Sequence, residues 1–112
     1  MLIYKIFRAP EWAAFRAAGE TAGAPVDLAD GFIHFSTAAQ LRTTAARHFA
    51  GEDGLVLVAV APETVGDTLA WEPSRGGDLF PHLYRRLLIS DVTWHADLPL
   101  GPEGHVFPED LA

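Results

Sequence analysis

Two short segments of similar make-up hold the side chains best suited to chemistry. The first is Asp-Gly-Phe-Ile-His-Phe-Ser-Thr at residues 30–37, and the second is Leu-Phe-Pro-His-Leu-Tyr at residues 79–84. Each sets a histidine among large apolar residues, with a hydroxyl side chain two positions later. An imidazole titrates near neutral pH and can donate, accept or bind a metal. The two segments therefore predict a functional cleft and leave its chemistry open.

The spacing predicts which of these side chains share a surface. Successive side chains of an extended segment point to opposite faces. His34 and Ser36 would then lie on one face, and His82 and Tyr84 would share a face in the same way. We expect the four to line one concave surface, with their apolar neighbours in the core. The alternative is structural: a hydrogen-bonded histidine in each case, and a helix cap in the case of Ser36.

A third segment adds a carboxylate and an arginine. Trp71-Glu72 is followed by Ser74-Arg75-Gly76-Gly77. Glycine lets a backbone come close to a ligand, and the arginine fork matches a phosphate or carboxylate. Arg75 is therefore a candidate ligand contact, and the alternative for this segment is an exposed turn.

A metal site is not predicted. It would need at least three convergent ligands, such as His34 and His82 with Glu72 or Asp78, and no pair has the short helical spacing of zinc enzymes. Among the other histidines, we expect a structural or surface role for His48. The remaining two are assigned no role.

Composition narrows the class of protein. The chain has no cysteine, which excludes disulfides and thiolate chemistry. No apolar run approaches the ~18 residues that span a bilayer, and the first residues form neither a basic leader nor a cleavage site. We expect a soluble cytoplasmic protein that does not bind membranes.

The charge distribution bears on partners. The net charge is −7, and residues 51–112 carry three basic against eleven acidic side chains. Such a surface repels phosphate backbones, so no nucleic-acid partner is predicted. A small anionic ligand is compatible, because screening over about 8 Å lets a local arginine outweigh distant carboxylates. The oligomeric state is not specified by the sequence.

The first half of the chain reads as a strand and two helices. A strand is predicted over residues 2–7 and a helix over residues 9–18, with Trp12, Phe15 and Ala18 facing the core.

The next segments are predicted to surround the first histidine. Breaker residues predict a loop over 23–31 and an extended segment over 32–36. Thr37 and Gln40 have capping-box spacing, which predicts a helix that continues to about Ala50.

The second half reads as a sheet. Residues 54–61 are apolar on both faces and predict a central strand. Pro81 favours an edge position or a strand start. Further strands are predicted at 68–72, 80–84, 87–89 and 92–94. The order indicates a single α+β domain over residues 1–98, with two early helices and a mainly antiparallel sheet. Residues 99–112 are expected to form an irregular tail packed on the surface.

Taken together, the motifs resemble a bacterial and plant family catalogued as a domain of unknown function, number 952. The resemblance rests on Gly-Phe-Ile-His-Phe-Ser-Thr, Trp-Glu, Phe-Pro-His-Leu-Tyr, the opening Ile-Tyr-Lys-Ile strand and the Arg-Gly-Gly turn, and covers roughly residues 2 to 98. Members often have histidine where this chain has Lys5 and glycine where it has Arg85.

The resemblance implies a fold similar to that of the ADP-ribosyltransferases, which bind NAD in a cleft between two small sheets. Two N-terminal helices would then pack on a split, mainly antiparallel sheet, with NAD as the substrate. The implied catalytic residues are His34, His82 and Glu72, and the implied ligand contacts are Ser36, Arg75 and Tyr84. In that arrangement His34 meets a ribose or phosphate, Arg75 a pyrophosphate, and Glu72 an oxocarbenium-like centre.

Three functional hypotheses follow. The first is an NAD-dependent transferase or NAD-cleaving enzyme. The second is a non-catalytic binding module for a small anionic ligand or a protein partner, since no known catalytic motif is present. A metal-dependent hydrolase is the third.

Overall fold

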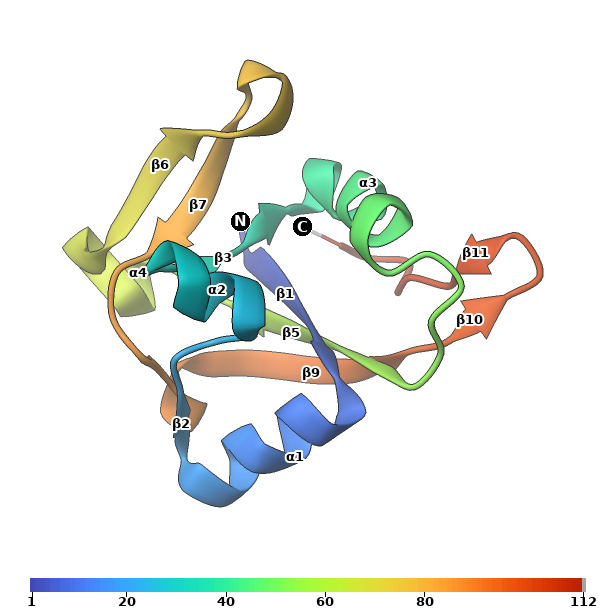
Figure 1. The fold of residues 1–112 in the computed structure, drawn as a ribbon, viewed down its shortest axis with the longest axis horizontal. Coiled ribbons are helices and arrows are strands. Elements are labelled where there is room, and N and C mark those ends of the chain that lie inside the picture. The colour runs from blue at the N-terminus through green and yellow to red at the C-terminus, as the bar shows by residue number, and fades with distance from the viewer. Residues whose placement is uncertain (112) are drawn as a thin grey trace.

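A four-stranded antiparallel sheet runs through the middle of the molecule (Figure 1). The computed structural model describes residues 1–111, apart from the side chain of Arg75. The strands of this sheet, in spatial order, are β4 (Ser36–Thr37), β1 (Ile3–Arg8), β5 (Leu55–Val60) and β9 (Val92–Leu98). Every residue of β5 is buried, which confirms the predicted central strand.

A second sheet of three antiparallel strands lies beside the first. Its order is β3 (Ile33–His34), β7 (Leu79–Leu83) and β6 (Leu69–Pro73). The chain passes directly from β3 in the second sheet to β4 in the first, with only Phe35 between them. The predicted extended segment over 32–36 therefore belongs to two sheets.

The prediction that Pro81 marks an edge or a strand start is wrong, because β7 is the middle strand of its sheet. The carbonyl of Pro81 accepts a hydrogen bond from the backbone N–H of Phe35, at 2.9 Å. A strand residue directs its N–H and its carbonyl to the same side. A backbone N–H at position 81, which proline does not have, would therefore point to the same side, past the last residue of β3. Because β3 ends at His34, its pairing with β7 does not need that N–H.

Two of the four α-helices among residues 1–111 are the predicted ones. Helix α1 (Ala9–Ala18) buries Trp12 and Phe15, but Ala18 is exposed, contrary to expectation. Helix α3 (Ala38–His48) begins at the predicted capping box: the Thr37 hydroxyl accepts from the N–H of Gln40, whose amide oxygen accepts from the N–H of Thr37.

The other two helices are short and were not predicted. Helix α2 (Pro25–Asp30) lies inside the predicted loop over 23–31. Its proline occupies the first turn, where a missing N–H costs nothing. The carboxylate of Asp27 closes that turn by accepting from the N–H of Ala24 at 2.7 Å, and Gly31, with φ of 85°, ends the helix. Helix α4 (Pro62–Val65) fills the predicted turn before β6.

Smaller elements complete the chain. Three single turns of 3₁₀ helix are η1 (Gly66–Thr68), η2 (Arg75–Gly77) and η3 (Ile89–Asp91). Two short pairs are β2 (Glu20–Thr21) with β8 (Leu87–Leu88), and β10 (Leu100–Gly101) with β11 (Gly104–His105). The last pair is a hairpin within the segment expected to be irregular. Every strand pairing described is antiparallel, so the α+β class with a mainly antiparallel sheet is confirmed.

The four-stranded sheet separates two apolar cores. Ile3 and Phe7 of β1 belong to the core that contains the aromatic residues of α1, whereas Tyr4 and Ile6 belong to the core that contains the inner face of α3. Alternation along β1 thus places Lys5 with Ile3 and Phe7, as a buried cation.

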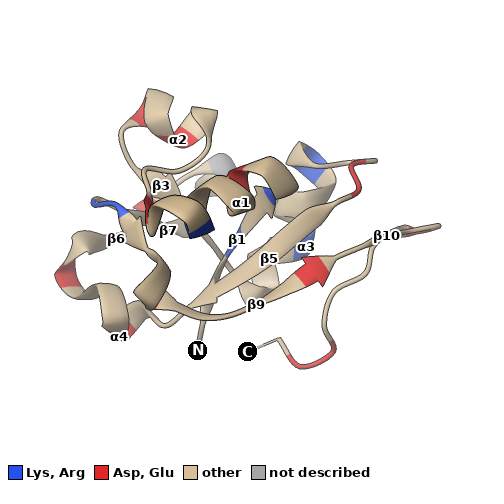
Figure 2. Cartoon of the chain, turned by 90° about the horizontal axis from the view of Figure 1, so that it is seen from below, with Lys and Arg blue, Asp and Glu red and all other residues tan. Residues whose placement is uncertain are grey.

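Charge is spread unevenly over this framework. Figure 2 shows acidic positions on α2, α4 and β9, whereas the basic positions include two on α3. No helix among residues 1–111 has the length and apolar character needed to span a membrane.

Candidate functional site

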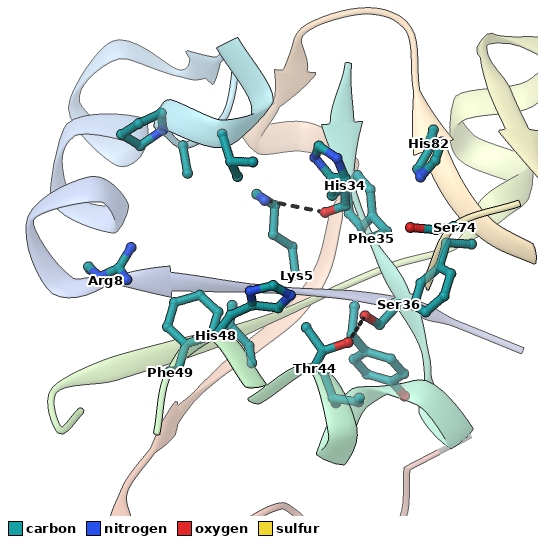
Figure 3. Close-up of a pocket in the computed structure, with 17 residues that line it drawn as sticks. Lys5, Arg8, His34, Phe35, Ser36, Thr44, His48, Phe49, Ser74 and His82 are labelled. Carbon is teal, nitrogen blue, oxygen red and sulfur yellow. Dashed lines mark hydrogen bonds between the residues drawn. The ribbon is translucent and has the colours of Figure 1, made fainter. Parts of the chain in front are cut away.

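His34 and His82 lie opposite each other in the three-stranded sheet. They form a cross-strand pair between β3 and β7, and their ring centroids are 5.3 Å apart. The ring of Phe32 lies against both, with its centroid 4.6 Å from His34 and 4.2 Å from His82. Both histidines border the same cavity (Figure 3).

This first cavity has a volume of about 520 Å³, within the usual range for small-molecule sites. Its walls come from both sheets, from α2 and from α3. The polar residues that line it are Tyr4, Lys5, Arg8, His34, Ser36, Thr44, His48, Ser74 and His82. The apolar residues are Ile6, Ala24, Pro25, Val26, Phe35, Leu41, Phe49 and Phe80.

His82 has one ring nitrogen engaged and one without a protein partner. Nδ1 lies 2.8 Å from Oε1 of Glu72, whereas the buried Nε2 has no hydrogen-bond partner. It is the one such buried side-chain nitrogen or oxygen among the described residues. A carboxylate only accepts, so Nδ1 donates, and a neutral ring then presents Nε2 as a bare acceptor. Leaving a buried polar atom unpaired costs about 1–3 kcal/mol.

Glu72 and Tyr84 support His82 from outside the cavity. The Tyr84 hydroxyl donates to the same Glu72 oxygen, at 2.7 Å. That bond, together with the one from His82, lowers the pKa of the Glu72 carboxyl, and it raises the pKa of the Tyr84 hydroxyl. Neither side chain is among the residues lining the cavity, so the structure does not give Tyr84 the place on a shared wall that alternation predicts.

His34 differs from His82 in having carboxylates at both ring nitrogens. Its Nδ1 lies 2.6 Å from Oδ1 of Asp27, and its Nε2 lies 3.1 Å from Oδ2 of Asp30. Each ring nitrogen thus has a carboxylate oxygen close to it. The ring therefore fastens α2 to β3, and neither nitrogen is left over for a ligand.

Asp27 is a site residue that the sequence analysis missed. Its carboxylate is fully buried and also accepts the backbone N–H of His34 at 3.0 Å and the Lys5 ammonium at 2.8 Å. Burial alone would raise the pKa of Asp27, but the hydrogen bonds from His34 and the charge of Lys5 outweigh it, and the pKa falls to about 2. An acidic N3 residue after a proline is the signal that predicts the helix and this carboxylate's place in it.

Lys5 and Arg85, the two departures from the family pattern, both have structural partners. Lys5 joins Asp27 and also donates to the carbonyl oxygen of His34, at 3.2 Å (Figure 3). The guanidinium of Arg85 forms a forked ion pair with Asp91, with N–O distances of 2.9 and 3.2 Å. Arg85 thereby holds the turn between β7 and β9 and has no place at the cavity.

Ser36 lines the cavity as part of a hydroxyl chain. Its Oγ lies 2.8 Å from Oγ1 of Thr44, which in turn donates to the carbonyl of Gln40 at 3.2 Å (Figure 3 shows the first contact). With the Thr44 proton directed to Gln40, Ser36 donates to Thr44 and keeps its lone pairs for a ligand donor. The cap of α3 is Thr37, so the alternative of Ser36 as the cap is wrong.

Arg75, the possible metal ligands and His48 are the remaining candidates from the sequence. The side chain of Arg75 lies outside the described part of the structure, although its neighbour Ser74 lines the cavity. The described residues contain no group of three or more His, Asp or Glu able to hold a metal. His48, for which a structural or surface role was expected, is exposed and lines the cavity from the end of α3.

Comparison with known proteins gives a family and no activity. The family model described as "Protein of unknown function (DUF952)" matches residues 6–95. The crystal structure of protein CC0527 from Caulobacter crescentus is 54% identical, with a TM-score of 0.89, over 94% of this chain and 92% of that one. The solution NMR structure of CC0527 is 55% identical, with a TM-score of 0.84, over 93% and 90%. No curated protein matches. The chain therefore belongs to the DUF952 family of proteins of unknown function.

Proposed function

We propose that the first cavity binds a small anionic ligand of the nucleotide class, with NAD as the first candidate. The observation that carries the proposal is the Nε2 of His82, a buried atom without a protein partner in a residue that lines the cavity. Buried polar groups in native proteins are almost always paired, so an orphan at a cavity wall favours a ligand that completes it. A ligand N–H or O–H would supply the missing bond.

Other features of the cavity support this ligand class. The Lys5 ammonium has three protons and two oxygen partners among the described residues, and lies 5.7 Å from the ring centroid of Phe7, so one proton is available to a ligand oxygen. Phe80 offers an aromatic surface for a heterocyclic ring. The walls come from both the four-stranded and the three-stranded sheet, which agrees with the cleft between two small sheets that the resemblance to ADP-ribosyltransferases implies.

The catalytic form of this proposal is ADP-ribosyl-type transfer. The bond between the ribose C1′ and the nicotinamide nitrogen breaks, and nicotinamide leaves with the electron pair. An acceptor hydroxyl or water forms the new bond to C1′, and Nε2 of His82 takes its proton. Glu72 would stabilise the imidazolium through Nδ1, which is the task of the carboxylate in a carboxylate–imidazole pair.

A non-catalytic binding module is the second candidate, and the position of Glu72 favours it. Glu72 does not line the cavity, and its Oε1 already accepts from His82 and Tyr84. The role given to Glu72 by the resemblance, direct stabilisation of an oxocarbenium-like centre, is therefore less well supported than binding. The two candidates share the cavity and differ only in turnover.

Titration with NAD, followed by assay of nicotinamide release, tests both candidates. We expect NAD to bind the wild type, and His82→Leu to weaken binding by about tenfold, since leucine removes the acceptor of a hydrogen bond at a buried site. His95→Leu is the matched control, because His95 is exposed and lies against Trp12, away from the cavity. It should bind NAD as the wild type does.

The outcomes separate the alternatives. Nicotinamide release that His82→Leu abolishes supports the transferase, whereas binding without release supports the module. The proposal fails if the wild type does not bind NAD, AMP or adenosine at millimolar concentration, or if His82→Leu binds as tightly as the wild type. Thermal unfolding of each variant checks that the fold is retained.

A further inference from the structure

A second cavity adjoins the first. It has a volume of about 440 Å³ and lies between α3 and the far end of the β6–β7 hairpin. Its walls are formed by Thr37, Ala39, Gln40, Thr43, Thr44, Arg47, Gly76, Asp78 and Phe80. Thr44 and Phe80 also line the first cavity. The two cavities therefore adjoin at these side chains.

The opposite walls of the second cavity are tied together. The side-chain amide of Gln40 on α3 donates to the carbonyl of Leu79 on β7, at 2.8 Å. The oxygen of the same amide is held by the N–H of Thr37 at 3.0 Å. Figure 1 shows the β6–β7 hairpin projecting away from the four-stranded sheet, and this bond links its far end to α3.

Arg47 is the one arginine with a described side chain that has no ion pair or aromatic contact within the described structure. The other arginines whose side chains are described have an ion pair or lie over an aromatic ring. Arg47 has neither, and no hydrogen bond within the described residues. Its five N–H donors are therefore available to a ligand, and the planar fork matches a phosphate.

Asp78 faces the same cavity from the hairpin. Its carboxylate is exposed and has no ion pair among the described side chains, including Arg47 on the other wall. A bare small anion would be repelled by this carboxylate. A ligand that combines a phosphate with hydroxyl donors satisfies both walls, because carboxylates accept hydrogen bonds from sugar hydroxyls. The charges thus select a phosphorylated sugar over inorganic phosphate.

We propose that the second cavity binds the sugar phosphate of a nucleotide whose base lies in the first cavity. The inference rests on the proposed function of the first cavity. The base stacks on Phe80 and, in the binding form of the proposed function, donates an N–H to Nε2 of His82. The sugar hydroxyls donate to Asp78, and Arg47 donates to the phosphate. Phe80 lies at the boundary, so the ligand crosses from one cavity to the other over its ring.

The test compares adenosine with AMP, which differ only in the phosphate. We expect the wild type to bind AMP about tenfold more tightly than adenosine, because a hydrogen bond from the charged Arg47 to the phosphate is worth about this much. Arg47→Gln should reduce AMP affinity to that of adenosine and leave adenosine affinity unchanged. Arg42→Gln is the matched control, because Arg42 lies on the same helix, over the ring of Phe107 and outside both cavities.

A second variant tests the sugar contact. Asp78→Asn should weaken adenosine and AMP by the same factor, about threefold to tenfold, because both carry the hydroxyls that the carboxylate accepts. Inorganic phosphate, added at the same concentration as AMP, should compete weakly if at all.

The inference is overturned if AMP and adenosine bind the wild type equally, or if Arg42→Gln lowers AMP affinity as much as Arg47→Gln. The second result would mean that net charge, and not a built contact, attracts the phosphate. Neither result would contradict the proposed function of the first cavity, since adenosine binding that depends on His82 would remain. Failure of every probe to bind, by contrast, overturns the proposed function and the inference together.

Discussion

His34 and His82 each have a carboxylate partner, but their second ring nitrogens differ in surroundings. Each directs Nδ1 to a carboxylate, Asp27 for His34 and Glu72 for His82. At His34 a second carboxylate takes the other nitrogen, so the residue serves to hold α2 in place. At His82 the other nitrogen has no protein partner. We therefore propose ligand contact at His82 and positioning at His34.

Asp27 should make the protein sensitive to acid. Its pKa is depressed from the ordinary 3.8 to about 2, so the unfolded chain binds this proton more tightly than the folded one. The contribution to stability is complete above pH 3.8, about 2 kcal/mol, and is lost as the pH falls towards 2. Unfolding by urea measured between pH 5 and pH 2 should show this loss.

The control for this prediction is Asp27→Asn, which has no proton to release. It should unfold with about 3 kcal/mol less free energy at neutral pH, because the Lys5 ammonium is left buried without a counter-charge. Its stability should also fall less between pH 4 and pH 2 than that of the wild type. Equal acid sensitivity in the two proteins would show that another carboxylate is responsible.

At the scale of single residues, the sequence predicted the positions of the histidines better than their partners. The repeated pattern of a histidine between apolar residues indicates a shared face, and the structure brings His34 and His82 to one cavity. Nothing in the spacing of Asp27 relates it to Lys5, because that contact crosses between a helix and a strand far apart in the chain. A tertiary contact of this kind cannot be predicted from the local sequence pattern.

Among the elements, α3 carries one wall of each cavity, and its start depends on the capping box. Thr37→Ala should lower the free energy of unfolding by about 1 kcal/mol, because the N–H of Gln40 loses its acceptor. Thr43→Ala is the matched control, since Thr43 is exposed within the same helix and alanine favours helix there. A loss of the same size at Thr43 would contradict the assigned cap.

Elements with strong local signals were predicted correctly. The apolar run of β5, the capping box of α3 and the proline at the start of α1 each specify their structure locally. Helix α2 was missed because its glycine and proline flanks, which in fact bound a short helix, resemble those of a loop. The prediction from Pro81 was wrong for a related reason. A proline can occupy the middle strand β7 because of where β3 ends, which the local sequence does not show.

For the molecule as a whole, the central feature is the junction of two sheets. The chain changes sheet at Phe35, so β3 brings His34 to the three-stranded sheet and β4 brings Ser36 to the four-stranded one. Both side chains then face the same cavity from different sheets. The class of fold follows from the order of elements, whereas this division into two sheets depends on pairings that no single segment specifies.

The most direct test of this account is the ¹⁵N resonance of the His82 imidazole during titration with NAD. We predict that the Nε2 signal shifts on binding as the nitrogen gains a partner, while the Nδ1 signal, held by Glu72, moves less. The signals of His105, whose Nε2 is bonded to the carbonyl of Glu52, should stay in place. An Nε2 signal that does not move while NAD binds elsewhere would contradict the central claim.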